Sequence, residues 1–184
     1  MAYEQAAGIA KDVLANVKSD QLDDPTPCSS WKVRDLINHL VGGSYFFAAA
    51  MNGESPGDGS DAPDFASSDF RAAYEQGSKL AVDAFAAPGA MARTVTVPFG
   101  EFPGAAWMGL AATDTFTHAW DLAKATGQST DLAPELAEQL LAGARQAISN
   151  DIRGDEPLPF GAEKDCPDGA TPADRLAAFL GRTV

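Results

Sequence analysis

Helical periodicity runs through most of this 184-residue chain and constrains its fold more than any other feature. Apolar residues recur three and four positions apart, which places them on one face of an α-helix. The segments with this spacing cover residues 3–18, 32–51, 70–85, 104–126, 134–148 and 172–180. Strand-like alternation occurs once, at residues 94–97, and the next residues can turn it back as a short hairpin. The sequence therefore predicts an all-α fold: a four-helix bundle with a short β-hairpin and short extra helices.

Proline, glycine and capping residues separate these segments. The prolines of residues 25–27 break the chain before the second helix, and residues 53–63 have the composition of a loop. Ser67 or Ser68 is expected to cap the third helix. Because the sequence has neither an internal repeat nor a linker that would separate two cores, we expect one domain over residues 1–184.

The charge balance argues against several classes of partner. Lysine and arginine number 13 against 26 aspartates and glutamates, so the formal net charge is −13. A chain this acidic repels phosphate backbones and anionic membrane surfaces, so we expect no nucleic-acid partner and no membrane binding. The chain contains neither an apolar run of about 18–20 residues nor a start typical of a signal peptide, which predicts a cytoplasmic protein. The sequence leaves open whether the protein forms a homodimer.

The two cysteines, Cys28 and Cys166, are too few and too far apart in sequence for a disulfide framework. Cys28 precedes His39 by eleven residues, which corresponds to roughly 16 Å along a regular helix. On this distance we expect Cys28 to be a packing residue and not a ligand or a catalytic thiol.

The chemistry of the chain is concentrated on two helices. The two histidines, His39 and His118, each lie on the apolar side of a predicted helix, and Asp114 and Asp121 share the stripe of His118. A buried carboxylate without a partner costs several kcal/mol. Asp114 and His118 are one helical turn apart, so their side chains can converge on one ion, with His39 as a third ligand from a facing helix. Two imidazoles and a carboxylate suit zinc, nickel, iron or manganese and leave positions open for water or substrate.

Other interpretations of the same residues remain open at this point. Either histidine could be an ordinary core residue with a satisfied hydrogen bond. Asp114 could pair with His118 in a charge-assisted hydrogen bond without any metal. Asp121, one turn beyond His118, could orient that imidazole and not bind the ion itself.

Three segments resemble a known family. They are PTPCSSWKVRDLINHLVGG at residues 25–43, THAWDLAKATG at residues 117–127 and RLAAFLGR at residues 175–182. Together they are similar to the actinobacterial metal-binding family of the DinB-like superfamily, which is related to the N-terminal domain of mycothiol-dependent maleylpyruvate isomerase. The resemblance implies a four-helix bundle with one divalent metal, zinc before nickel, iron or manganese, at its centre.

The resemblance also implies a ligand set, because its pattern has a histidine on the second helix and an acid-x-x-x-His pair on a later one. The matching residues are His39, Asp114 and His118. The family acid is usually glutamate, whereas Asp114 is one methylene shorter, so direct binding and binding through a water both remain open. No segment resembles the separate C-terminal domain of the isomerase, so maleylpyruvate isomerisation itself is not expected.

Two function hypotheses follow from the residues and the resemblance. The first is a metal- and thiol-dependent transferase or isomerase that uses mycothiol or a similar small thiol as cosubstrate and acts on a small electrophile. The second is a non-catalytic metal-binding or interaction protein of the same fold, in which the ion only stabilises the native state. An exchangeable position on the metal distinguishes the first from the second.

Overall fold

The computed structural model describes residues 1–28, 30–54, 63–149, 152–154 and 160–184. Most of the predicted loop at residues 53–63 lies outside these ranges. The described chain forms α1 (Ala2–Ala15), α2 (Val33–Met51), α3 (Phe70–Ala86), β1 (Thr94–Val97), β2 (Gly100–Pro103), α4 (Gly104–Ala125), α5 (Pro134–Ala147) and α6 (Pro172–Phe179). Short 3-10 turns lie at Ser19–Gln21, Phe65–Ser67 and Ala90–Ala92.

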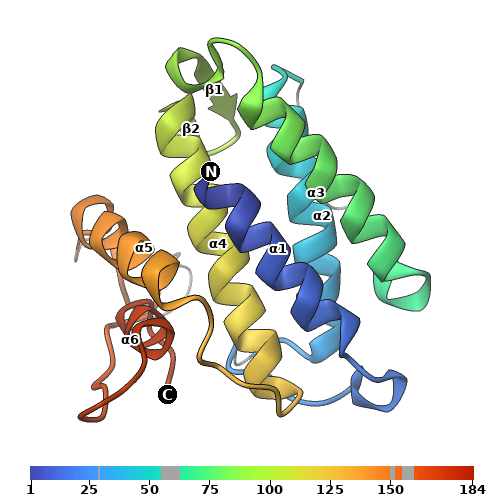
Figure 1. The fold of residues 1–184 in the computed structure, drawn as a ribbon, viewed down its shortest axis with the longest axis vertical. Coiled ribbons are helices and arrows are strands. Elements are labelled where there is room, and N and C mark those ends of the chain that lie inside the picture. The colour runs from blue at the N-terminus through green and yellow to red at the C-terminus, as the bar shows by residue number, and fades with distance from the viewer. Residues whose placement is uncertain (29, 55–62, 150–151, 155–159) are drawn as a thin grey trace.

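The first four helices form the predicted bundle (Figure 1). α2 packs along α3 and α1 packs along α4, while contacts of α2 with α4 and of α1 with α3 close the bundle. The antiparallel hairpin of β1 and β2 lies at one end of it, and α5 and α6 pack together on the side of α4 away from α3 (Figure 1). The mostly helical fold with one short hairpin is therefore confirmed.

Large side chains of α4 occupy the centre of the structure. Trp107, Phe116 and Trp120 are buried, together with Leu36 and Ile37 of α2. Burial of a large apolar side chain is worth about 1.5–3 kcal/mol. Most of α4 is thus held between other elements, which gives the polar residues on the same helix a rigid base.

Two predicted helix ends were wrong. The third helix begins at Phe70 and is capped by Asp69, whose carboxylate accepts a hydrogen bond of 3.1 Å from the backbone N–H of Ala72. Ser67 ends the preceding 3-10 turn instead. The first helix ends at Ala15 and not at residue 18, because Asn16 takes the C-cap position and its side chain donates to the carbonyl of Asp12. In both places a short polar side chain that bonds the backbone sets the boundary.

Among the described residues, no helix combines the length and the apolar character that crossing a membrane requires.

Candidate metal centre

The three predicted ligands converge between α2 and α4. His39 lies in the second turn of α2, and Asp114 and His118 lie one turn apart in α4. His39 Nε2 is 3.3 Å from Oδ1 and 3.2 Å from Oδ2 of Asp114. His118 Nε2 is 3.6 Å from Asp114 Oδ1. One ligand atom from each residue can be chosen so that all three lie within 4.8 Å of one another.

These separations match what one metal ion needs. Two N or O ligands at about 2.1 Å from an ion, in a tetrahedral arrangement, are about 3.4 Å apart. The nitrogen-to-oxygen distances of 3.2 and 3.6 Å lie on either side of that value. The residues present therefore fit a divalent ion, with the short Asp114 side chain already in contact with Nε2 of both imidazoles.

The ligand set is open to solvent on one side. The side chains of His39 and Asp114 are 34% and 27% exposed, whereas that of His118 is 11% exposed. The indole of Trp31 covers part of the site: its ring centroid is 5.0 Å from that of His39 and 5.4 Å from that of His118, over which it stacks. An exchangeable ligand could thus approach from the side of His39 and Asp114.

Electrostatics favour a charged Asp114. Burial alone would raise the pKa of Asp114, but the neighbouring His39, followed by His118, outweighs it and lowers this pKa to about 2. Burial acts to lower the pKa of His39, and the Asp114 charge beside it raises the pKa overall. The site therefore holds one carboxylate that stays ionised and can attract a cation.

A second carboxylate, Asp121, lies behind His118 and is fully buried. Its Oδ2 accepts from His118 Nδ1 at 3.0 Å, from Arg182 Nη2 at 3.0 Å and from the Cys28 thiol at 3.3 Å. Its Oδ1 accepts from Arg182 Nε at 3.2 Å. Burial acts to raise the pKa of Asp121, but the hydrogen bond from His118 and the charge of Arg182 lower it overall. Because Asp121 engages Nδ1, the Nε2 atom of His118 is left for Asp114 and an ion.

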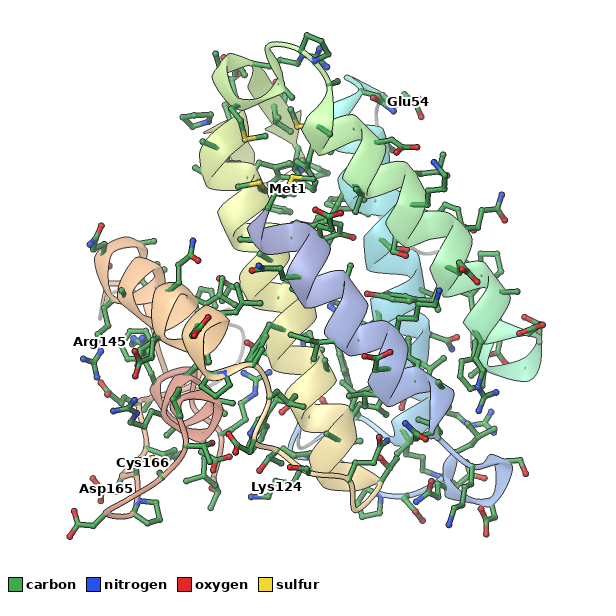
Figure 2. All side chains as sticks on the ribbon, in the orientation of Figure 1. Met1, Glu54, Lys124, Arg145, Asp165 and Cys166 are labelled. Carbon is green, nitrogen blue, oxygen red and sulfur yellow. The ribbon has the colours of Figure 1, made fainter. Side chains whose placement is uncertain are left out.

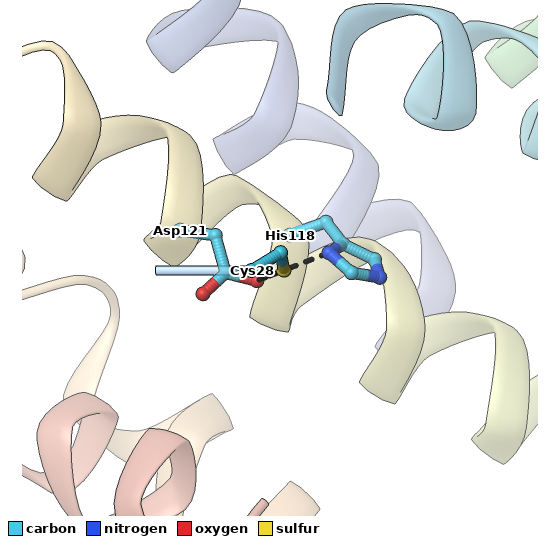
Figure 3. Close-up of side chains that lie close together, drawn as sticks. All are labelled: Cys28, His118 and Asp121. Carbon is cyan, nitrogen blue, oxygen red and sulfur yellow. Dashed lines mark hydrogen bonds and ion pairs between the residues drawn. The ribbon is translucent and has the colours of Figure 1, made fainter. Parts of the chain in front are cut away.

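The distance argument against Cys28 was wrong. The chain before α2 folds back: Pro25 pairs with Lys32, while Thr26 Oγ1 accepts from the backbone N–H of Cys28 and donates to the carbonyl of Trp31. Since α2 begins only at Val33, the rise of 1.5 Å per residue does not apply before it. The Cys28 thiol instead lies beside His118 and Asp121 (Figure 3).

Cys28, His118 and Asp121 can also be grouped as ligands by distance, but their surroundings disfavour a cation. Arg182 Nη2 is 3.6 Å from Cys28 Sγ and 3.0 Å from Asp121 Oδ2. A cation here would lie against the positive guanidinium of Arg182, which already neutralises Asp121. Without a metal, burial, followed by the Asp121 charge, raises the pKa of Cys28 to about 12. We therefore assign these residues to the support of His118 and not to a second metal site.

Sequence reasoning found three residues of the cluster and its neighbour Asp121 but missed Arg182. The only signal for Arg182 was its place at the end of the tail segment RLAAFLGR. The other cysteine, Cys166, lies in the loop between α5 and α6, beside Asp165 and outside the bundle (Figure 2).

The fold and the site together define a helical bundle with a candidate metal centre between two of its helices. The chain belongs to the mycothiol maleylpyruvate isomerase N-terminal domain family, which it matches over residues 3–123. Uncharacterised proteins of Mycobacterium tuberculosis strains CDC 1551 / Oshkosh and ATCC 25618 / H37Rv are each 48% identical to it over 184 residues. Each of these comparisons covers 100% of this chain and 97% of the relative.

The crystal structure of the mycothiol-dependent maleylpyruvate isomerase has a similar fold. Its TM-score to this chain is 0.59 at 16% sequence identity, over 85% of this chain and 74% of that chain. At this identity the likeness establishes a shared fold, and the function has to be argued from the residues of this chain.

Proposed function

We propose that this protein binds one divalent metal ion through His39, Asp114 and His118 and uses it in a thiol-dependent transferase or isomerase reaction. The cosubstrate would be mycothiol or a similar small thiol, and the substrate a small electrophile. Zinc is the ion that we expect, with nickel, iron and manganese as alternatives. The observation that carries the proposal is the convergence of both Nε2 atoms on the Asp114 carboxylate, at 3.2 and 3.6 Å.

The residues of the chain have separate tasks in this proposal. When bound, the metal would supply the positive charge that lowers the pKa of a thiol ligand and so provides a thiolate at neutral pH. Asp114 would attract the ion and lies within 3.6 Å of Nε2 of both imidazoles. Asp121 accepts a hydrogen bond from Nδ1 of His118 and thereby orients the imidazole ring of His118. Trp31 shields both imidazoles on one side.

The partial exposure of His39 and Asp114 supports a catalytic site over a purely stabilising one. A structural zinc site is closed by four protein ligands, whereas these three leave room for an exchangeable one. We further propose that residues 1–184 form one cytoplasmic domain, since α5 and α6 both pack on α4. The free thiols of Cys28 and Cys166 suit a reducing compartment.

Metal analysis of tag-free protein tests the binding site. We expect about one ion per chain, no binding in His118→Ala and strongly weakened binding in His39→Ala. Asp83→Asn, which neutralises an exposed carboxylate on α3, is the matched control and should bind the metal as the wild type does. Full metal occupancy in both histidine variants would refute the ligand assignment.

A thiol titration of the cobalt-loaded protein tests the chemistry. Binding of a small thiol to the ion should change the visible spectrum of cobalt and release about one proton per site, because the thiol binds as thiolate. An unchanged spectrum at saturating thiol would favour the non-catalytic alternative. Quenching of Trp31 fluorescence by bound cobalt, lost in Trp31→Phe, would locate the ion independently of the histidine variants.

A further inference from the structure

The C-terminal tail reaches the candidate metal centre. Arg182 lies outside residues 3–123, the part of the chain that matches the family, yet its side chain makes two hydrogen bonds to Asp121, with Nε to Oδ1 at 3.2 Å and Nη2 to Oδ2 at 3.0 Å. Such a two-point contact between a guanidinium and a carboxylate fixes orientation as well as charge.

The end of α6 fixes the backbone of Arg182. The N–H of Gly181 bonds to the carbonyl of Ala178 and the N–H of Arg182 to that of Ala177, each at 3.0 Å. With Gly181 at φ +92°, this is a Schellman motif, which needs a residue in the left-handed region. A Cβ on Gly181 would also lie 2.8 Å from the Cα of Gly161. The turn therefore directs Arg182 back to α4.

Other contacts hold the same tail against the C-terminal half of α4. Trp120 Nε1 donates to Asp174 of α6 at 2.8 Å, and Lys124 Nζ donates to the carbonyl of Thr183 at 3.1 Å. Arg182 lies between these two contacts, and its side chain is mostly buried, with 17% exposed. The guanidinium is thus held by the packing of α6 and does not reach Asp121 as a loose surface side chain.

We propose that Arg182 is a positioning residue for the candidate metal centre: through Asp121 it holds the His118 ring with Nε2 directed at Asp114 and the ion. Asp121 has four donors, of which Arg182 supplies two and His118 one. Without Arg182 the carboxylate can rotate away from His118 Nδ1, and the imidazole loses its fixed orientation. The inference rests on the proposed metal site.

Zinc titrations of the wild type and three variants test this role. Arg182→Ala should lower zinc affinity about 10- to 100-fold, the usual effect of losing a partner behind a metal ligand. Arg182→Lys, which keeps the positive charge but not the planar two-point contact of the guanidinium, should recover part of the loss. Arg175→Ala removes an arginine of α6 that pairs with the exposed Glu138, and it should bind zinc as wild type. Equal affinity of Arg182→Ala and Arg175→Ala would refute the proposal.

A double-mutant cycle separates positioning from simple loss of tail packing. In an Asp121→Asn background, Arg182→Ala should cost little further zinc affinity, because its effect runs through the carboxylate. A full additional loss in that background would show that the tail acts by another route and would overturn the proposal. In cobalt-loaded protein, Arg182→Ala should also alter the visible spectrum, which a loss of stability alone would leave unchanged.

A measurement on metal-free protein keeps this inference apart from the proposed function. If the wild type binds no metal, the proposed function fails. The hydrogen bonds of Asp121 with His118 and Arg182 can then still be tested by NMR, through the exchange of the His118 Nδ1 proton with solvent. We expect slow exchange in wild type and in Arg175→Ala, and exchange at least about tenfold faster in Arg182→Ala. Equal exchange rates in all three proteins would refute the role of Arg182 even without a metal.

Discussion

The contribution of the Asp114 charge to the stability of the fold can be tested quantitatively, because the pKa shifts give both the size of this contribution and its dependence on pH. The pKa of Asp114 falls from 3.8 to about 2 through its histidine neighbours, despite burial. At about 1.4 kcal/mol for each unit of pKa, the ionised carboxylate stabilises the metal-free fold by about 2 kcal/mol. Asp114→Asn keeps the shape and removes the charge, so it should lower the free energy of unfolding by about that amount.

The pH range in which the pair of Asp114 and His39 stabilises the fold follows from the directions of their two pKa shifts. A lowered carboxyl pKa gives stabilisation that is complete above the unfolded value of 3.8 and is lost as the pH falls through about 2. The raised pKa of His39 gives stabilisation that is complete below its unfolded value of 6.5 and is lost as the pH rises through the folded value. The pair is therefore fully charged between 3.8 and 6.5.

Urea unfolding of metal-free wild type and Asp114→Asn, with a chelator present, measures this effect. At about pH 5.5 we expect a difference of about 2 kcal/mol, which should shrink at about pH 8.5 as His39 loses its proton. Asp83→Asn is the control and should stay within about 0.5 kcal/mol of wild type. A difference for Asp114→Asn that is equal at both pH values would refute the reasoning, because it would come from packing and not from charge.

Three further outcomes follow from the same contacts. Asp114→Asn should also lower zinc affinity at least about tenfold if the carboxylate binds directly, as we expect from its contacts with both Nε2 atoms. Tighter binding by Asp114→Glu would show that a water intervenes. Cys28→Ser keeps a donor to Asp121, so zinc affinity and any thiol-transfer activity should stay within about threefold of wild type; lost activity with full metal content would identify a protein thiolate as nucleophile. Asp69→Ala removes the cap of α3 and should cost about 1 kcal/mol in urea unfolding, with zinc affinity unchanged.

Helical periodicity was enough to predict the bundle, because each long helix buries one face. The spacing of Asp114 and His118 depends only on local helix geometry, so their convergence could be predicted from sequence. His39 was expected to be the third ligand because it lies on the apolar side of another predicted helix, and the resemblance implied the same residue. Nothing local to α2 shows which helix faces it, so this part of the prediction depended on how the bundle packs. The structure brings the three residues together as predicted.

The segments that sequence reasoning missed are those without regular periodicity. The turn at residues 25–32 is held by the hydroxyl of Thr26 and by one bridge between Pro25 and Lys32. A helical rise applied to such a turn gives the wrong position for Cys28. Arg182 approaches Asp121 from 61 positions away in sequence, and only the packing of α6 on α4 shows that the two meet.

The two aspartates of α4 show why the tail matters to the chemistry. Asp114 and Asp121 flank His118 on the same helix, and both hydrogen-bond or pair with an imidazole. Arg182 neutralises Asp121, whereas in the described part of the chain the partly exposed Asp114 pairs with the two histidines. With neutral imidazoles, the ligand set then carries a single negative charge, so a divalent ion bound there would keep one positive charge. That remaining charge would favour an anionic thiolate as the next ligand. The sequence places both carboxylates one turn from His118, and the position of Arg182 decides which of them is left to attract a cation.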